Sequence, residues 1–454
     1  MPERKFALSF RSMNGPQLFS WCTKFSTAGR SSGRKRLKSC GLGNRTCDVQ
    51  PRPSARSRLL NAGSTPRYFD HNATCPLHPA ARGAWLEAVD RHWHNPSSLS
   101  AAATAARESL EDARERLADL LGCEAGRIVF TGSATAANNA LARQLALEPA
   151  GVAVVSPLEH PCVAESFAAA LPGRVVELPV DDAGRVDLDA AAAQLEAIAE
   201  PAIVSVLAAS NETGVLQPWR ELLAVCRSRR IPFHTDAAQW IGRLPATDLG
   251  QCDFVTGSGH KFGGPKGVGF LVVPEKAGSF RGDRGGPQQE GRWAGTENLP
   301  GIVAMVAALE AVAAAAGQLD PAVIEPRRQA RDRAETQLVA ALPEVIVLGR
   351  GAERLWNTLA VIVPGHDGRR LVAALERQGI IASTGSACSS GSEATARAVT
   401  AIGPERLGMA AGQPWGMLRL SGGWQTTAAD WQAAAEAVVA VVSEPSRPCR
   451  VSLG

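Results

Sequence analysis

The order of apolar and polar residues from about residue 67 onward constrains the fold more than any other feature of this sequence. Short apolar runs, each bounded by polar residues or glycine, alternate with segments of helical periodicity. The runs are R-I-V-F (127–130), V-A-V-V (152–155), V-V-E-L (175–178), I-V-S-V-L-A (203–208), I-P-F-H-T (231–235), F-V-T (254–256) and V-G-F-L-V-V (268–273). Such runs, separated by helices, are typical of buried strands in a mostly parallel sheet. The pattern therefore predicts an α/β protein.

Helical periodicity is clearest at residues 105–122. Apolar side chains recur there at three- and four-residue steps, at Leu110, Ala113, Leu117 and Leu120, before a glycine suited to the C-terminal cap, Gly122. A second region contains helical segments at 329–342, 371–377 and 430–442 and a strand-like run at 359–363. We expect a large domain over 67–320 and a smaller α+β domain over 321–454, with which the first residues of the body can also pack.

Composition narrows the class of protein. The chain has 454 residues, 45% hydrophobic and 20% charged, which is ordinary for a soluble globular protein with two domains. Its longest apolar run, 302–316, contains Glu310 and is too short to span a membrane, so we expect a buried helix and no membrane partner. Ten cysteines occur without C-x-x-C or zinc-ligand spacing. This usage predicts reduced thiols, a cytoplasmic location and no metal site.

Positive charge is concentrated in residues 1–66, which hold 13 Lys and Arg against 2 Asp and Glu. That segment carries +11, which leaves −7 for the rest of a chain whose total is +4, so nucleic acid is not an expected partner of the body. The segment has no long apolar stretch, which argues against a secretory signal. Three interpretations stay open: a disordered or non-native extension, a transit peptide that would direct the protein to an organelle matrix, or a functional basic arm.

Polar residues follow the apolar runs at the points where strands would end. They are T-G-S-A-T (131–135), His160, S-N-E-T-G (210–214), Asp236 with Gln239, and Lys261. Each has a plain structural role when taken alone: a turn, a structural histidine, a helix cap or a solvated lysine. The carboxyl ends of parallel strands, however, form one ligand-binding crevice. Together the residues supply what pyridoxal phosphate requires: a phosphate cradle at a helix N-terminus, a ring to stack on, a carboxylate for the pyridine nitrogen and a Schiff-base lysine.

Cys388 lies in T-G-S-A-C-S-S-G (384–391), among small polar residues. A cysteine that fills a core has apolar neighbours instead. An exposed thiolate in a Ser/Gly-rich stretch is suited to nucleophilic chemistry, and an incidental free thiol is the alternative. Five other cysteines lie near apolar runs or strand ends and are expected to be inert: Cys75, Cys123, Cys162, Cys226 and Cys252.

These motifs resemble those of the cysteine desulfurases of the class V aminotransferase group, which are fold-type I pyridoxal-phosphate enzymes. The resemblance covers about residues 68–442 and rests on Y-F-D-H-N-A-T (68–74), N-P-S-S (95–98), T-G-S-A-T, E-H (159–160), N-E-T-G (211–214), D-A-A-Q (236–239), S-G-H-K (258–261), A-G-T-E-N (294–298), G-S-A-C-S-S-G (385–391) and L-R-L-S (418–421). It implies conversion of L-cysteine to L-alanine, with the sulfur passed as a persulfide on Cys388 to an acceptor such as an iron–sulfur scaffold protein, tRNA or a sulfur-containing cofactor.

The resemblance also implies a role for each matching residue. The catalytic residues would be Lys261 as Schiff-base lysine and Cα base, Cys388 as sulfur nucleophile, and His160 stacked on the ring. The cofactor contacts would be Asp236 at the ring nitrogen, Asn211 and Gln239 at the phenolic oxygen, and Ala134, Thr135, Ser258 and His260 at the phosphate. Thr296 would reach the phosphate of a second subunit, which implies a homodimer. Arg419 would bind the substrate carboxylate through its bidentate fork, unless it is a structural ion-pair arginine.

Three stretches depart from the family pattern. Ala136 stands where an acid is usual after the T-G-S-A-T turn. Gln289-Glu290 and Trp293 stand where Glu-Arg and arginine are common, and residues 393–396 replace Leu-Glu-Pro-Ser. None of these changes removes a residue assigned to catalysis.

Two other function classes stay open. One is a different pyridoxal-phosphate reaction, such as that of a selenocysteine lyase, a β-lyase or an aminotransferase, against which Cys388 argues. The other is a non-catalytic homologue, against which the retained Lys261, Asp236 and Arg419 argue.

Overall fold

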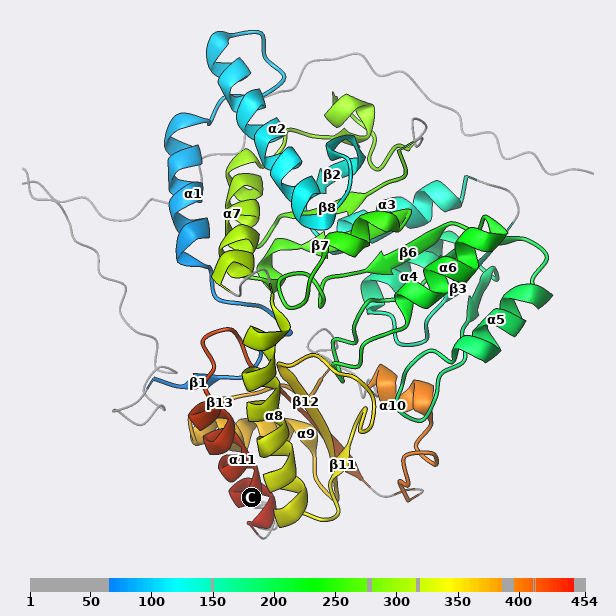
Figure 1. Ribbon diagram of the computed structural model, residues 1–454, viewed down its shortest axis with the longest axis vertical. Coiled ribbons are helices and arrows are strands. Elements are labelled where there is room, and N and C mark those ends of the chain that lie inside the picture. The colour runs from blue at the N-terminus through cyan, green and yellow to red at the C-terminus, as the bar shows by residue number, and fades with distance from the viewer. Residues whose placement is uncertain are drawn as a thin grey trace, which may run out of the picture. The chain divides into compact units, whose positions relative to one another are not determined.

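The computed structural model describes residues 65–147, 151–275, 280–315, 319–385, 396–410, 412 and 414–444 (Figure 1). All of these residues belong to one compact unit. Its larger sheet has seven strands in the order β2-β8-β7-β6-β5-β3-β4. Their bounds are β2 (Ile128–Thr131), β3 (Val152–Val155), β4 (Val175–Glu177), β5 (Pro201–Ser205), β6 (Phe233–Asp236), β7 (Phe254–Ser258) and β8 (Gly269–Val272).

The larger sheet is mostly parallel, as the sequence predicts. Strands β3 to β7 pair in parallel. Strand β8 pairs antiparallel with both β7 and the edge strand β2, so it alone runs against the direction of the other strands of this sheet. Parallel pairing brings the carboxyl ends of β3, β5, β6 and β7 to the same edge. The polar residues that follow these strands are therefore neighbours in space although the sequence separates them.

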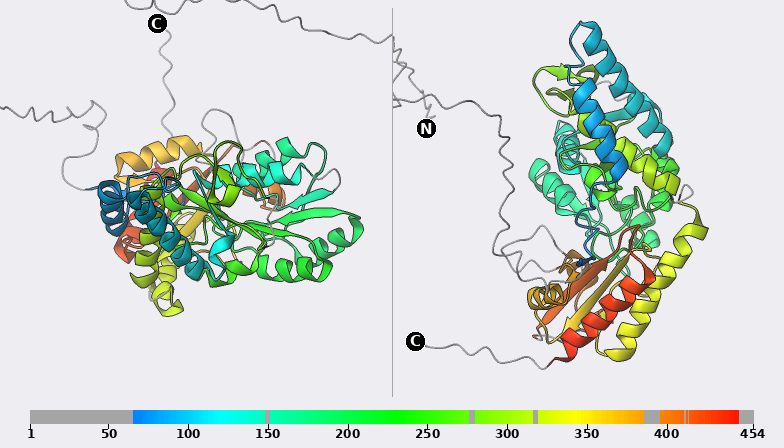
Figure 2. Two further views of the ribbon diagram at one scale, coloured as in Figure 1. Left: turned by 90° about the horizontal axis from the view of Figure 1, so that it is seen from above. Right: turned by 90° about the vertical axis from the view of Figure 1, so that its left-hand side faces the viewer.

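Helices cover both faces of this sheet (Figure 2). On one face, strand residues pack against α2 (Ala101–Leu121), α5 (Leu188–Ala197), α6 (Trp219–Arg229) and α7 (Leu299–Ala315). On the other, residues such as Val155 and Ile203 pack against α3 (Ala134–Leu145) and α4 (Pro161–Ala170). Burial on both faces explains why the strands read as continuous apolar runs.

The predicted helix at 105–122 is confirmed as α2. Leu110, Ala113 and Leu117 are buried, and Leu121 rather than Leu120 completes the inner face because it lies one turn after Leu117. Gly122 caps the helix with a φ of +69°, where a Cβ would meet the Thr247 carbonyl. The run at 302–316 forms most of α7, which packs against α1 (Pro79–Arg91). No helix within the described ranges is long and apolar enough to cross a membrane.

The C-terminal region forms a second, antiparallel sheet. Its strands are β11 (Ile346–Val347), β12 (Thr358–Pro364) and β14 (Trp415–Ser421), and its core is shared with α8 (Pro321–Ala341), α9 (Gly368–Arg377) and α11 (Ala428–Ser443). The strand at the start of the body, β1 (Arg67–Tyr68), pairs in parallel with β13 (Ile380–Ile381). The segment that follows β1 therefore starts beside the C-terminal region and continues toward the larger sheet. The boundary between 67–320 and 321–454 stays a prediction.

Gly269 offers a test of how tightly the larger sheet meets the turn before α3. A Cβ at this position would lie 2.7 Å from the Gly257 carbonyl oxygen and 2.9 Å from the Ser133 carbonyl carbon. We expect Gly269→Ala to lower the free energy of unfolding by about 1–3 kcal/mol because the backbone must move. The control is Gly83→Ala, at an exposed position of α1 where a Cβ would meet no neighbouring element within 4 Å. This change should be neutral or stabilising by about 0.5–1 kcal/mol. Urea unfolding measures both, and equal losses would contradict the expectation.

Candidate active site

Lys261 lies in the short turn that follows β7. Its Nζ donates to the carbonyl oxygens of Asn72 at 2.7 Å and Ala73 at 3.0 Å. Both carbonyls belong to the segment after β1, in the motif Y-F-D-H-N-A-T. The lysine amine therefore lies where the carboxyl edge of the sheet meets the first described segment of the chain.

Asp236 ends β6 and is 6% exposed. Its Oδ1 accepts the backbone N–H of Ala238 at 2.9 Å, so it does stabilise the following turn. Its Oδ2 faces the Asn138 amide at 3.5 Å and the Cys162 thiol at 3.7 Å. Both contacts of Oδ2 are long, so this oxygen keeps acceptor capacity for a protonated ring nitrogen.

His160 begins α4 as its N-cap. The Nδ1 atom accepts the backbone N–H of Cys162 at 3.1 Å, so the proton of the neutral ring is on Nε2. Burial lowers the pKa of His160, the positive charge of Lys261 lowers it further, and the negative charge of Asp236 opposes both. A neutral ring is suited to stack on an aromatic cofactor and to donate a proton through Nε2.

The predicted phosphate cradle lies at the N-terminus of α3. Ser133 caps this helix by accepting the Ala136 N–H at 3.1 Å, and Ala134 is buried while Thr135 is exposed in the first turn. Ser258 ends β7, and burial with the nearby Lys261 charge lowers the pKa of His260 to about 4. A helix N-terminus with free N–H groups attracts phosphate.

Asn72 joins several predicted residues, although the sequence analysis assigned it no role. Its Nδ2 donates to the Asn211 carbonyl at 3.2 Å and to Thr358 Oγ1 at 3.0 Å. Its carbonyl, which accepts from Lys261, also accepts the Gln239 Nε2 at 3.0 Å. Gln239 and Asn211 are thereby brought beside Lys261. Asn72 belongs to the motif at 68–74, but the sequence could not show its role, because its hydrogen-bond partners lie 139 and 286 residues away along the chain.

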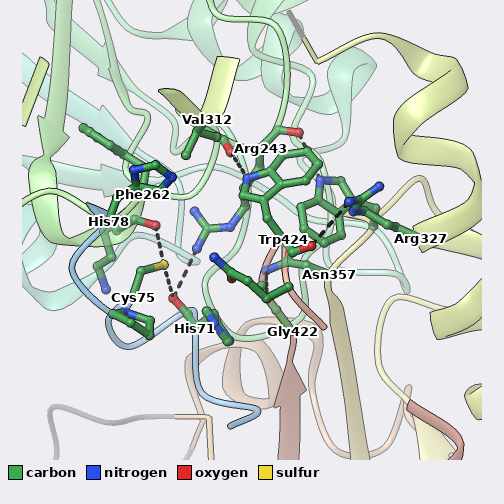
Figure 3. A pocket seen from close by; sticks show the side chains of 17 residues that line it. His71, Cys75, His78, Arg243, Phe262, Val312, Arg327, Asn357, Gly422 and Trp424 are labelled. Carbon is green, nitrogen blue, oxygen red and sulfur yellow. Dashed lines mark hydrogen bonds between the residues drawn. The ribbon is translucent and has the colours of Figure 1, made fainter. Parts of the chain in front are cut away.

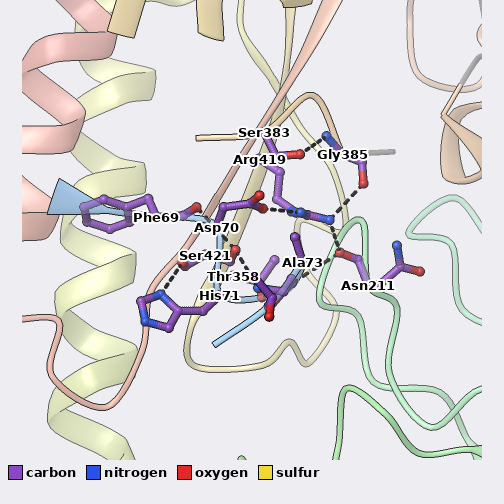
Figure 4. Close-up of polar contacts among 12 residues, drawn as sticks. Phe69, Asp70, His71, Ala73, Asn211, Thr358, Ser383, Gly385, Arg419 and Ser421 are labelled. Atoms are coloured by element: carbon purple, nitrogen blue, oxygen red, sulfur yellow. Dashed lines mark hydrogen bonds and ion pairs between the residues drawn. The ribbon is translucent and has the colours of Figure 1, made fainter. Parts of the chain in front are cut away.

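Arg419 is 1% exposed and lies on β14 (Figure 4). Its Nη2 pairs with Asp70 Oδ1 at 2.6 Å, and its Nη1 donates to the carbonyls of Asn211 at 2.9 Å and Gly385 at 2.8 Å. The buried Nε has no hydrogen-bond partner among the described residues. Arg419 thus acts as a structural ion-pair arginine, and its binding of a substrate carboxylate stays a prediction.

Cys388 lies outside the described residues, but its neighbours in sequence are tied to the N-E-T-G motif. Before it, Gly385 accepts from Arg419, which also binds the Asn211 carbonyl. After it, the Glu212 carboxylate accepts the N–H groups of Arg397 at 3.3 Å and Ala398 at 2.9 Å, at the start of α10 (Arg397–Ile402). Burial raises the thiol pKa of each described cysteine, which agrees with their expected inertness.

Thr296 is exposed in the loop between β10 (Trp293–Ala294) and α7, and its contact with the phosphate of a second subunit stays a prediction. It lines a cavity of about 230 Å³ together with Gln289 and Trp293. The Gln289 amide accepts the Phe130 N–H at 2.8 Å and donates to the Phe130 carbonyl at 2.9 Å. This departure from the family pattern therefore has a structural role, because it satisfies the free edge of β2.

A buried polar cluster lies behind His160 and Asp236 and was not singled out from the sequence. The Ser205 hydroxyl donates to Glu159 Oε1 at 3.0 Å and lies 2.8 Å from His234 Nδ1. Burial, reinforced by the negative charge of Asp236, raises the pKa of Glu159 to about 8. Burial lowers the pKa of His234 to about 3. Both side chains are therefore uncharged near neutral pH.

The site residues fit pyridoxal phosphate by their chemistry. A lysine amine, a buried carboxylate, a neutral histidine ring and a helix N-terminus lie at one edge of the sheet. The buried Oε1 of Gln239 and Oδ1 of Asn138 have no hydrogen-bond partner in the described part of the chain, as expected where a polar ligand completes a site. No group of three His, Cys, Asp or Glu side chains suited to a metal ion occurs among these residues.

Comparison with known proteins agrees with this chemistry. A model of the class-V aminotransferase family matches residues 67–433. A cysteine desulfurase of Cereibacter sphaeroides is 37% identical over 342 residues, 74% of this chain and 86% of that protein. One of Sinorhizobium fredii is 37% identical over 355 residues, 76% and 90% of the two chains. A solved NifS-like protein superposes with a TM-score of 0.73 at 26% identity, over 84% of this chain and all of that one.

The chain therefore belongs to the class-V aminotransferase family and, within it, to the cysteine desulfurases. The α/β fold expected for a fold-type I enzyme is confirmed, as is the expectation that the protein is an enzyme.

Two adjacent asparagines in α3 allow a matched test of how Asp236 is held. Asn138 is fully buried and donates toward Asp236 and Cys162, whereas Asn139 donates only to the Thr135 carbonyl near the surface. We expect Asn138→Ala to cost about 1–3 kcal/mol of unfolding free energy, because buried polar partners lose their hydrogen bonds. Asn139→Ala should change it by less than about 0.5 kcal/mol. Similar values in urea unfolding would show that Asn138 has no special role.

Glu159 predicts a pH dependence of stability. The unfolded chain loses the Glu159 proton near the ordinary pKa of 4.5, whereas the folded protein keeps it up to about 8. The folded state binds more protons over this window, so the stability contributed by Glu159 is full below pH 4.5 and is lost as pH rises to 8. We expect Glu159→Gln to gain stability relative to wild type as pH rises through this window. Denaturant unfolding at several pH values measures this, and a stability difference between variant and wild type that does not change with pH would contradict the expectation.

Proposed function

We propose that this protein is a pyridoxal-phosphate-dependent cysteine desulfurase that releases L-alanine from L-cysteine and keeps the sulfur as a persulfide on Cys388. Its membership of the cysteine desulfurases supports this activity. The observation that carries the proposal is the gathering of Lys261, Asp236 and His160 at one edge of the sheet, beside the N-terminus of α3.

Different residues of the site would contact different parts of the cofactor. Lys261 would bind it through Nζ, Asp236 would keep its ring nitrogen protonated, and His160 would cover the ring. The phenolic oxygen would contact Asn211 and Gln239, and the phosphate would contact Ala134, Thr135, Ser258 and His260. When bound, pyridoxal phosphate supplies an electron-poor ring that stabilises negative charge on the substrate carbon.

The chain itself would supply the proton transfers and the sulfur nucleophile. Lys261, once displaced by the substrate amine, would take the Cα proton, and the Nε2 proton of His160 is available for return to the product. The Cys388 thiolate would attack the substrate sulfur. A sulfur–sulfur bond forms as the Cβ–sulfur bond breaks, and the electron pair stays on the carbon fragment, which is protonated and leaves as alanine.

Exposed apolar residues support a homodimer. Trp93 is 69% exposed and Leu99 fully exposed, and Leu86 and Val89 on α1 are each more than two-fifths exposed. An exposed cluster of this kind near one helix favours a protein interface. Thr296 would then contact the phosphate bound by the second subunit. We further propose a sulfur-acceptor protein, with an iron–sulfur scaffold as one candidate, and a cytoplasmic location.

Desulfuration can be tested directly. With pyridoxal phosphate and L-cysteine, we expect alanine together with an alkylation-detectable persulfide on Cys388. Lys261→Ala should abolish both products, and Cys388→Ser should abolish the persulfide and lower alanine formation at least about a hundredfold. Cys123→Ser, a half-buried thiol away from the site, is the control and should keep both.

Each other outcome of this assay would indicate one of the alternative functions. Alanine formation that survives in Cys388→Ser without persulfide would indicate a lyase. Keto-acid formation would indicate an aminotransferase. Bound cofactor with no product from any amino acid would indicate a non-catalytic homologue.

A further inference from the structure

A separate cavity of about 210 Å³ borders the catalytic lysine (Figure 3). Of the cofactor contacts predicted from the sequence, only Lys261 is among the residues that line it. Its walls are largely apolar and include Phe262, Val312 and Trp424. The Trp424 ring packs on that of Trp356 with centroids 4.5 Å apart. Aromatic side chains therefore form part of the cavity wall.

A buried cation points into this cavity. Arg243 is only 4% exposed, and Figure 3 shows its guanidinium between Cys75 and Trp424. It donates to the carbonyls of Ala238, Gln239 and His71, at 3.4, 3.3 and 3.3 Å, which are long contacts. No Asp or Glu of the described chain forms an ion pair with it. Burial lowers the pKa of Arg243, in keeping with a charge that nothing nearby neutralises.

Neighbouring polar groups do not balance that charge. Burial lowers the pKa of His71 to about 4, so its ring is neutral at physiological pH. The Cys75 thiol has a pKa raised by burial, and it donates to the carbonyls of Lys261 at 3.0 Å and His71 at 3.7 Å. Two further cations line the cavity, Lys261 and Arg327, and the guanidinium of Arg327 lies 4.9 Å from the centroid of the Trp424 ring. A buried charge without a counter-ion is costly, and a guanidinium does not escape the cost by losing its proton.

We infer that this cavity binds a small carboxylate with an apolar body, whose carboxylate pairs with the Arg243 guanidinium. A carboxylate matches the planar fork of arginine, and the apolar body would replace water against the aromatic walls. A dry protein cavity of about 150 Å³ accommodates benzene, so 210 Å³ admits a ligand somewhat larger than benzene. The ligand class is thus a monocarboxylate of benzoate size. Arg419, the predicted partner of the substrate carboxylate, is not among the residues that line the cavity.

Benzoate is a suitable probe, with benzyl alcohol as its uncharged counterpart. Isothermal titration of the full chain loaded with pyridoxal phosphate should show benzoate binding at one site per chain. Benzyl alcohol should bind at least about tenfold more weakly, because it cannot neutralise Arg243. This comparison needs no variant and so cannot fail through misfolding.

Variants then locate the site. Arg243→Met should weaken benzoate binding at least about tenfold, and Val312→Phe should do so by filling the cavity while leaving the charge in place. Arg327→Met is the matched control. It should weaken benzoate binding less than Arg243→Met does, because Arg327 is half-exposed and stacked on Trp424. Thermal unfolding of each variant checks that it is folded.

Several results would overturn the inference. Absence of benzoate binding at millimolar concentration would do so, and so would equal affinity for benzyl alcohol. Displacement of benzoate by L-alanine would place it at the substrate site instead. A loss of benzoate affinity in Arg327→Met alone would show that benzoate binds at the surface beside Arg327. None of these results depends on desulfurase activity, so the inference and the proposed function can fail independently.

Discussion

The ion pair between the buried Arg419 and the partly exposed Asp70 is the interaction on which the site depends. It joins residues 349 positions apart, from β14 and from the segment after β1. The same guanidinium holds the carbonyls of Asn211 and Gly385. Loss of the Asp70 carboxylate would leave the buried Arg419 charge without its counter-ion, which is destabilising. The pair therefore places the segment whose Asn72 and Ala73 carbonyls hold Lys261.

Burial then decides which groups of the site are charged. Glu159 and His234 are fully buried and neutral, and burial also favours the neutral ring of His160. Asp236 lies among them with only weakly bonded partners at Oδ2. In a low-dielectric interior one charge influences all its neighbours, so the neutral surroundings make Asp236 the dominant negative charge beside Lys261.

Sequence patterns predicted the residues whose positions follow from local structure. Asp236, His160 and Lys261 could be predicted because each follows an apolar run, and parallel strands end at one edge. The helix at 105–122 and its cap at Gly122 follow from periodicity and from the conformational freedom of glycine. Asn72, Asn138 and Glu159 were missed, because each acts through side-chain contacts with elements far away in the chain.

The sequence by itself determined the α/β class, the strand ends and the family, because these depend on periodicity and on ordered motifs that are local along the chain. Only the tertiary structure decided that Arg419 pairs with Asp70, that Gln289 closes the edge of β2, and that Arg243 is buried without a carboxylate partner among the described residues. The physical reason is that hydrogen bonds and charges act over a few ångströms in space, and the distance along the chain does not limit them.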